Sequence, residues 1–197
     1  MALPIAHATA GYLVYEAVRP SGAGQRLGLL AAAVVLANAP DLDFVPGLLL
    51  GRPETFHRGV THTLGAAVVV AALAFLLARL VSAAPGVARR AAMVAGAAWA
   101  SHLVLDYFTA DAFPPSGARF LWPLSYAYWI SPVPLLREVL LDRSSSAAFF
   151  RSLLTGDTLT VWTEEVALFV CAVAGVRMMR VLGGAIEPVP RSIAEEP

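Results

Sequence analysis

The sequence predicts an all-α protein, a multi-span transmembrane helical bundle with an interfacial loop rich in aromatic residues and proline. Three observations lead to this fold class. Of the 197 residues, 58% are hydrophobic and 14% are charged, whereas soluble domains carry about 25% charged residues. The mean hydropathy is +0.68. Long apolar runs alternate with short segments that contain glycine, proline or arginine, as expected for helices that cross about 30 Å of hydrocarbon.

The N-terminal part predicts two short helices, at about residues 5–18 and 25–39. Each is marginal as a membrane span alone. The segment 19–24, Arg-Pro-Ser-Gly-Ala-Gly, is rich in turn-forming residues. We therefore expect the two helices to form a hairpin.

Two longer segments follow, at about 60–84 and 87–108, and each is long enough to span a membrane. Pro85 and Gly86 predict a tight turn between them. A third apolar segment, at about 159–182, carries two glutamates near its start and two arginines near its end. These segments form one membrane-embedded domain, 1–185, and the proline-rich, acidic tail 186–197 is expected to be disordered.

Between residues 111 and 158 the composition changes, because prolines punctuate a stretch that contains several tryptophans and tyrosines. These two aromatic residues favour the headgroup level of a membrane. We expect an interfacial loop, with short helices such as 135–150, that covers one end of the bundle.

The arginines suggest an orientation. They flank the first turn, the second turn and the end of the last helix, which threading back and forth places on one side of the membrane. The positive-inside rule assigns that side to the cytoplasm. The opposite, extracytoplasmic end then collects all four histidines and several acids. We expect an integral protein of a bacterial or archaeal cell membrane.

The histidines and three aspartates form the candidate metal site. Histidine nitrogen and carboxylate oxygen are the ligand set of zinc, manganese or iron sites. Burying such ionisable groups in apolar helices costs free energy, so their presence indicates a functional site. The candidate ligands are His7, Asp41, Asp43, His57, His62, His102 and Asp106.

The spacing of these residues supports one shared site. His102 and Asp106 are four residues apart and project from one helical face. Asp41 and Asp43, in an extended segment, would point the same way. His57 and His62 flank a predicted helix start, for which Thr61 is available as a cap. One histidine alone could be a hydrogen-bonded core residue, but the whole set at one end of the bundle favours a metal.

Arg58 and Asp43 are the candidate catalytic residues. Arg58 could form a salt bridge to a ligand carboxylate or clamp an anionic substrate through its planar fork, and we favour the clamp. Glu164 and Glu165 could be ligands, a general base or interfacial charges, and we favour the last role.

The residues also carry a resemblance. His7, Pro40-Asp41-Leu42-Asp43, the run from His57 to Thr63, and His102-Leu103-Val104-Leu105-Asp106 resemble the YdjM-type family of membrane-bound proteins described as metal-dependent hydrolases. The resemblance covers about residues 1–125. Thr63 stands where serine is more usual. The family is thought to be distantly similar to zinc-dependent phospholipase C, whose glutamate ligands lack a clear counterpart here.

The resemblance implies a hydrolase, and we expect a phosphoesterase that acts on a lipid or another membrane-proximal ester. One or more Zn²⁺ ions, or Mn²⁺, would activate water. Membrane lipids are expected partners, and the zero net charge gives no support for nucleic acid. The alternative is a non-enzymatic metal-binding or scaffold protein with a structural His/Asp site. A transport path is disfavoured, because the ionisable groups stop at one end of the bundle.

Overall fold

The computed structural model describes residues 2–19, 26–81 and 84–186, and this part of the chain contains helices and loops but no β-strand. The elements are α1 (Pro4–Val18), α2 (Leu27–Asn38), η1 (Ala39–Asp43), α3 (Phe44–Leu49), η2 (Val60–His62), α4 (Leu64–Leu80), α5 (Pro85–Tyr107), α6 (Ser146–Ser152) and α7 (Gly156–Ile186). The predicted all-α class is confirmed. Most of the predicted turn at 19–24 and the tail 187–197 lie outside the described residues.

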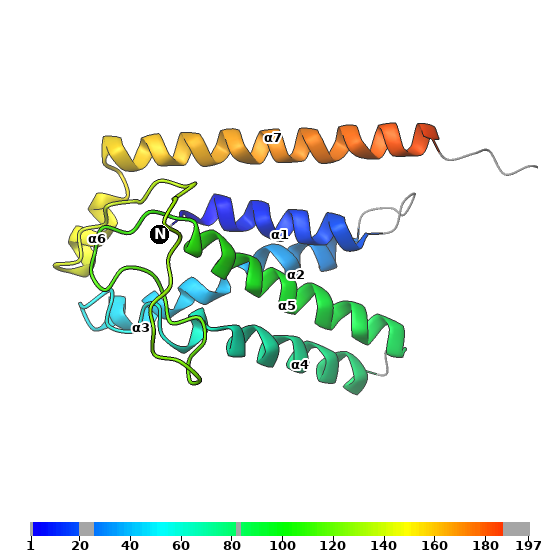
Figure 1. The fold of residues 1–197 in the computed structure, drawn as a ribbon, viewed down its shortest axis with the longest axis horizontal. Coiled ribbons are helices and arrows are strands. Elements are labelled where there is room, and N and C mark those ends of the chain that lie inside the picture. The colour runs from blue at the N-terminus through cyan, green and yellow to red at the C-terminus, as the bar shows by residue number, and fades with distance from the viewer. Residues whose placement is uncertain (1, 20–25, 82–83, 187–197) are drawn as a thin grey trace, which may run out of the picture.

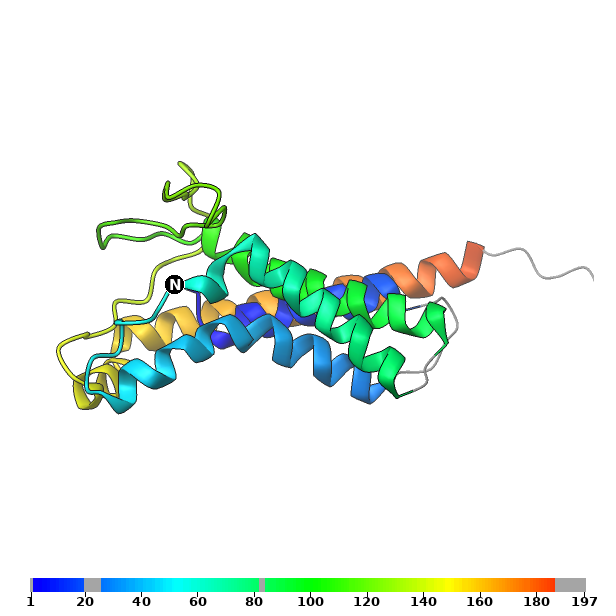
Figure 2. The ribbon, with the colours of Figure 1, turned by 90° about the horizontal axis from the view of Figure 1, so that it is seen from below.

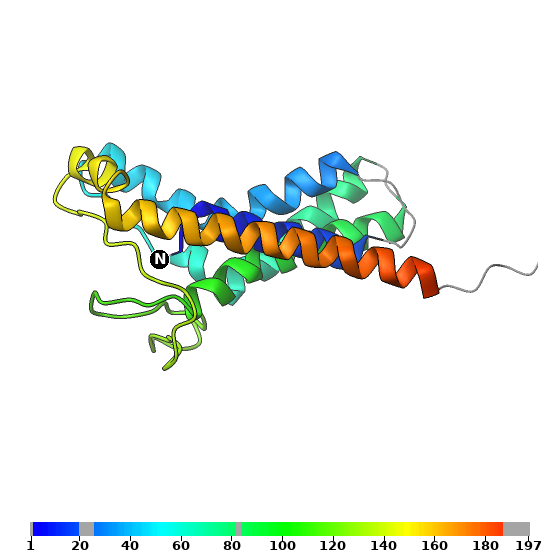
Figure 3. The same cartoon turned by 90° about the horizontal axis from the view of Figure 1, so that it is seen from above.

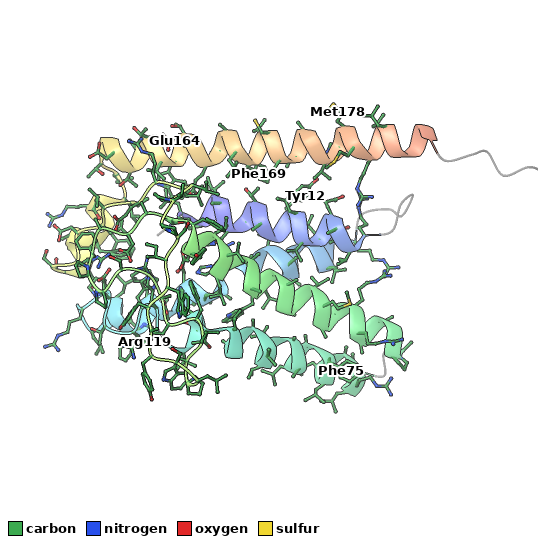
Figure 4. The ribbon with its side chains drawn as sticks, in the orientation of Figure 1. Tyr12, Phe75, Arg119, Glu164, Phe169 and Met178 are labelled. Carbon is green, nitrogen blue, oxygen red and sulfur yellow. The ribbon has the colours of Figure 1, made fainter. Side chains whose placement is uncertain are left out.

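Helices α1, α2, α4 and α5 form a bundle, and α7 runs alongside α1 at its edge (Figure 1). The view from above shows the same relation, with α7 crossing over the bundle along its length (Figure 3). Tyr12 of α1 and Phe169 of α7 make an edge-to-face contact, with ring centroids 6.3 Å apart (Figure 4). At the far end Arg180 of α7 donates to the buried carboxylate of Glu16 at 2.6 Å.

Small residues bring the bundle helices close together. A Cβ added to Gly11 would lie 2.6 Å from the carbonyl oxygen of Ala33, and one added to Gly96 would lie 2.9 Å from the Cβ of Ala71. Glycine at these positions therefore allows α1 to approach α2, and α5 to approach α4, as in other membrane helix pairs.

Several details of the predicted elements are corrected by the structure. Asp41 and Asp43 lie in the 3₁₀ helix η1 and not in an extended segment. Helix α4 begins only at Leu64, and its cap is Thr63, whose Oγ1 accepts from the Ala66 N–H at 3.0 Å, so Thr61 is not the cap. Of the expected helix at 135–150, only Ser146–Ser152 is helical. Pro85 begins α5 instead of forming a turn with Gly86.

Two helical stretches in the described part are long and apolar enough to cross a membrane, Leu27–Leu49 and Gly156–Gly183. The first stretch is long because α2, η1 and α3 follow one another without a break. The predicted helix at 25–39 was shorter, since it did not include this continuation. Helix α4 is apolar but shorter. Fewer spans meet this test than the multi-span bundle of the prediction requires.

The segment between α5 and α6 leaves the bundle as loops gathered at one end (Figure 2). It is held by a backbone pair in which the Ala118 and Trp129 N–H groups donate to each other's carbonyls at 3.2 and 2.9 Å. An apolar cluster fixes the same end, with residues from the cap of α1, from α3, α6 and α7 and from this segment. It consists of Leu3, Phe44, Val139, Leu141, Phe149 and Val161.

Candidate metal centre

All seven predicted ligands meet at the end of the bundle where α1 begins and α5 ends. They come from five places in the chain: α1, η1, the loop before η2, η2 and α5. They form three overlapping groups whose ligand atoms lie within 4.8 Å of one another: His7, His102 and Asp106; Asp41, His62 and His102; and Asp43, His57 and His62. The predicted convergence of these residues at one end of the bundle is therefore confirmed.

Four ligand atoms taken from these groups form an inner cage: His62 Nε2, His102 Nε2, Asp41 Oδ1 and Asp106 Oδ2. The Nε2 atoms of His62 and His102 lie 3.1 Å apart. Each of these nitrogens lies 3.5 Å from Asp41 Oδ1 and 3.5 Å from Asp106 Oδ2. Both histidine side chains are fully buried, and Asp106 is nearly so. The four atoms thus surround one small, buried point.

The other nitrogen of each ring fixes how the ring is turned. His102 Nδ1 lies 2.9 Å from the carbonyl oxygen of Ala37, and His62 Nδ1 lies 3.1 Å from Asp43 Oδ2. A carbonyl or carboxylate oxygen accepts, so each Nδ1 carries the proton. In the neutral ring, each Nε2 then presents a lone pair to the cage, which is the arrangement of histidines that bind metal.

Asp43 also holds His57. His57 Nδ1 lies 3.0 Å from Asp43 Oδ1, and Thr61 Oγ1 donates to Asp43 Oδ2 at 2.8 Å. The His57 ring stacks on Phe44 with centroids 3.7 Å apart. Burial lowers the pKa of His57, despite the opposing effect of Asp43, which favours the neutral imidazole.

His7 borders the cage on another side. Its ring stacks on that of His102 with centroids 3.8 Å apart. Its Nε2 lies 3.9 Å from Asp41 Oδ2 and 3.9 Å from Asp106 Oδ1. Each of these aspartates therefore turns one oxygen to the cage and the other to His7.

Many polar atoms of the cluster are buried without a hydrogen-bond partner. They are both ring nitrogens of His7, Asp41 Oδ1, His57 Nε2 and both carboxylate oxygens of Asp106. Leaving a buried polar group unsatisfied costs about 1–3 kcal/mol. A cation bound among these atoms would remove that cost, so the residues fit a metal.

Arg58 lies beside the cluster in a strained backbone conformation, with φ of +59°, which is uncommon for a residue other than glycine. Its Nη1 pairs with Asp111 and donates to the carbonyl oxygen of Gly117 at 3.3 Å. The salt bridge to a ligand carboxylate, which was the alternative to the favoured clamp, is thus replaced by a pair with Asp111. The Nε of Arg58 is buried and has no partner.

Asp111 was missed by the sequence analysis. Its carboxylate also accepts from the Gly117 N–H at 2.8 Å. Burial acts to raise the pKa of Asp111, but the Gly117 hydrogen bond and the Arg58 charge outweigh it and lower that pKa. In turn, Asp106 and Asp111 raise the pKa of Arg58 against the effect of burial. The one available signal was the position of Asp111 just after the helix of His102 and Asp106.

A cavity of about 640 Å³ opens beside this cluster. Asp43, His57, Arg58 and Thr61 line it from the cluster side, and the loop after α5 lines the other. The loop contributes Phe113, Trp122, Tyr128 and Arg119, the last of which is labelled in Figure 4. The cavity gives a ligand access to one edge of the cluster.

The two glutamates of α7 lie away from the cage and have structural partners. Glu165 is buried and accepts from the Leu3 and Ala6 N–H groups at 2.6 and 2.9 Å, at the start of α1. Glu164, labelled in Figure 4, accepts from the exposed Arg137 at 3.0 Å. Neither belongs to a group of candidate ligands in the described residues.

Comparison with known proteins adds the family. The family model described as YdjM inner membrane protein matches residues 1–182. The chain therefore belongs to this family of inner membrane proteins, and the match extends well beyond the 125 residues that carried the resemblance. No curated protein and no solved structure matches the chain.

Proposed function

We propose that this member of the YdjM inner membrane protein family is a metal-dependent hydrolase whose metal centre is built from His7, Asp41, His62, His102 and Asp106. One observation carries the proposal. A tetrahedral ion with bonds of about 2.0–2.1 Å has ligand atoms about 3.3–3.4 Å apart. The five separations in the cage that include a histidine Nε2 are 3.1 Å once and 3.5 Å four times. A mixed nitrogen and oxygen set of this size suits Zn²⁺, and Mn²⁺ is the second choice.

The oxygens that face His7, Asp41 Oδ2 and Asp106 Oδ1, are candidate ligands for a second ion. Each lies 3.9 Å from His7 Nε2, so the three atoms offer three protein ligands. The inner cage uses four protein ligands and is coordinatively closed, whereas a site with three leaves a position for water. The proposal therefore includes one or more ions, which these histidines and aspartates would hold.

A zinc ion held by these residues would supply Lewis-acid activation of water for the hydrolysis of an ester. The protein does the positioning. Asp43 keeps His57 and His62 in fixed orientations through their Nδ1 atoms. Arg58 lines the cavity, and we assign its guanidinium the stabilisation of negative charge that develops on substrate oxygens.

The proposed substrate is a phosphoester of a lipid or of another membrane-proximal molecule. The loop after α5 exposes apolar and aromatic side chains, among them Leu124 at 92%, Tyr126 at 68% and Trp129 at 45%. Such residues suit the headgroup level of a bilayer. A cavity beside this loop would meet lipid headgroups before soluble ligands.

The arginine distribution supports a site on the extracytoplasmic face. In a Cys171→Ala background, cysteine in place of the exposed Arg52 is expected to react with an impermeant maleimide in intact cells. Cysteine in place of Gly86, at the other end of the bundle, is expected to stay unlabelled. The reverse pattern would place the site in the cytoplasm.

A structural metal site is the second candidate, because the inner cage is closed and its histidines are fully buried. A hydrolysis panel decides between the two. Purified, zinc-loaded protein is offered a phosphomonoester, a phosphodiester and phospholipid micelles. A hydrolase turns over at least one of them and loses that turnover in His102→Ala. A metal-loaded protein that hydrolyses none would support the structural role.

A further inference from the structure

The charges around the cavity are paired, with one exception. Glu54 pairs with Arg143, and Asp111 pairs with Arg58. Asp43 is engaged by His57 and His62. Arg119 also lines the cavity, yet it makes no ion pair within the part of the chain that the structure describes. It is the cavity arginine whose charge is left for a ligand.

The guanidinium of Arg119 is held in place. Its Nη2 donates to Tyr128 Oη at 2.7 Å, and its Cζ lies 4.9 Å from the centre of the same ring. Arg119 and Tyr128 are the neighbours of Ala118 and Trp129, whose backbones are paired. This pairing keeps the two side chains together before any ligand arrives, which lowers the entropic cost of binding.

Gly117 makes this arrangement possible. Its φ is +88°, and a Cβ at this position would lie 2.3 Å from the carbonyl oxygen of Trp129. The Gly117 backbone is also bonded to both members of the Arg58–Asp111 pair. The same turn therefore positions Arg119 on the loop and Arg58 beside the metal cluster, on one cavity.

We propose that Arg119 binds a phosphate group of the ligand that occupies this cavity. A guanidinium donates to two oxygens of one anion at once. A carboxylate has only two oxygens and is satisfied by one such fork. A phosphate has further oxygens, and Arg58 lines the same cavity and carries a second guanidinium. The assignment of the cavity to a substrate rests on the proposed function, but binding of phosphate by Arg119 does not require catalysis.

The test measures binding by calorimetry on full-length protein in detergent. The probes are inorganic phosphate and, separately, phosphatidylcholine micelles that contain phosphatidic acid. Arg119→Gln is expected to weaken binding at least tenfold, and Tyr128→Phe a few-fold. Arg119→Lys, which keeps the charge but loses the fork, is expected to fall between wild type and Arg119→Gln. Arg52→Gln removes an exposed arginine outside the cavity and is the matched control, with binding unchanged.

The two probes identify the source of the phosphate. A dependence on Arg119 with the micelles alone indicates a lipid headgroup, and a dependence with inorganic phosphate indicates a soluble ligand. The proposal is overturned if wild type binds neither probe, or if a folded Arg119→Gln variant binds both like wild type. Metal content is measured on the same samples. A protein that holds metal and hydrolyses an ester, but whose phosphate binding does not change in Arg119→Gln, would contradict this inference alone. Phosphate binding that depends on Arg119 in a protein that takes up no metal would contradict the proposed function alone.

Discussion

His62 and His102 bring their Nε2 atoms to 3.1 Å from each other across a separation of 40 residues in the chain. Because the Nδ1 atom of each ring faces an acceptor, both Nε2 atoms carry lone pairs when the rings are neutral. Two lone pairs at this distance repel each other unless a proton or a cation lies between them. The carboxylates of Asp41 and Asp106 complete the surroundings of that point, which favours a divalent ion.

The first prediction concerns Asp43, which orients two histidines. Asp43→Asn keeps the size of the side chain but cannot accept from both rings through two oxygens. We expect zinc affinity to fall about 10- to 100-fold, the usual effect of losing such a supporting carboxylate. Competition with a chelator measures it, and Asp157→Asn, an exposed aspartate of α7, is the control. Equal affinity in the two variants would remove Asp43 from the site.

The second prediction separates the two glutamates of α7. Glu165→Ala leaves the buried Leu3 N–H without its acceptor and leaves the Ala6 N–H with only the Leu3 carbonyl, and we expect a loss of about 1–3 kcal/mol in stability. Glu164→Ala removes an exposed ion pair and is expected to be nearly neutral. Thermal unfolding in detergent tests both. The metal content of the inner cage is expected to persist in each variant, and its loss would make that glutamate a ligand.

The third prediction is a pH dependence from Asp111, whose folded-state pKa is lowered by the Gly117 hydrogen bond and by Arg58 although burial opposes them. A lowered pKa contributes stability above the ordinary carboxyl pKa of about 3.9 and loses it as the pH falls through the folded value. Asp111→Asn should therefore be less stable than wild type at pH 7, with the gap narrowing below about pH 4. Unfolding curves from pH 3 to pH 7 measure the gap, and a constant gap would show that the charge of Asp111 contributes nothing.

The convergence of the ligands at one end of the bundle could be predicted from sequence, because a chain that runs back and forth returns to the same end after every second helix. The spacing of His102 and Asp106 also sufficed to place both on one face of α5. Predicting that the ligands share one end of the bundle required only the number of helices between them, and no knowledge of how the helices pack.

The separate roles of Asp41 and Asp43 could not be predicted in the same way. An extended segment would point them together, but in the 3₁₀ helix η1 residues two apart face different directions. Asp41 therefore enters the cage, and Asp43 lies behind His62. The pairs of Arg58 with Asp111 and of Arg119 with Tyr128 depend on a long loop with no regular period, so no pattern in the sequence indicated them.

Metal content is the most direct test of the central claim that the buried histidines and aspartates form a metal centre. The protein is purified without added chelator and analysed by inductively coupled plasma mass spectrometry beside His62→Ala, His102→Ala and the Asp157→Asn control. We predict at least one zinc or manganese ion per wild-type and control chain, and a clear loss in both histidine variants, since removing a ligand weakens coordination strongly. A wild-type protein that carries no metal and gains no thermal stability from added Zn²⁺ or Mn²⁺ would contradict the claim.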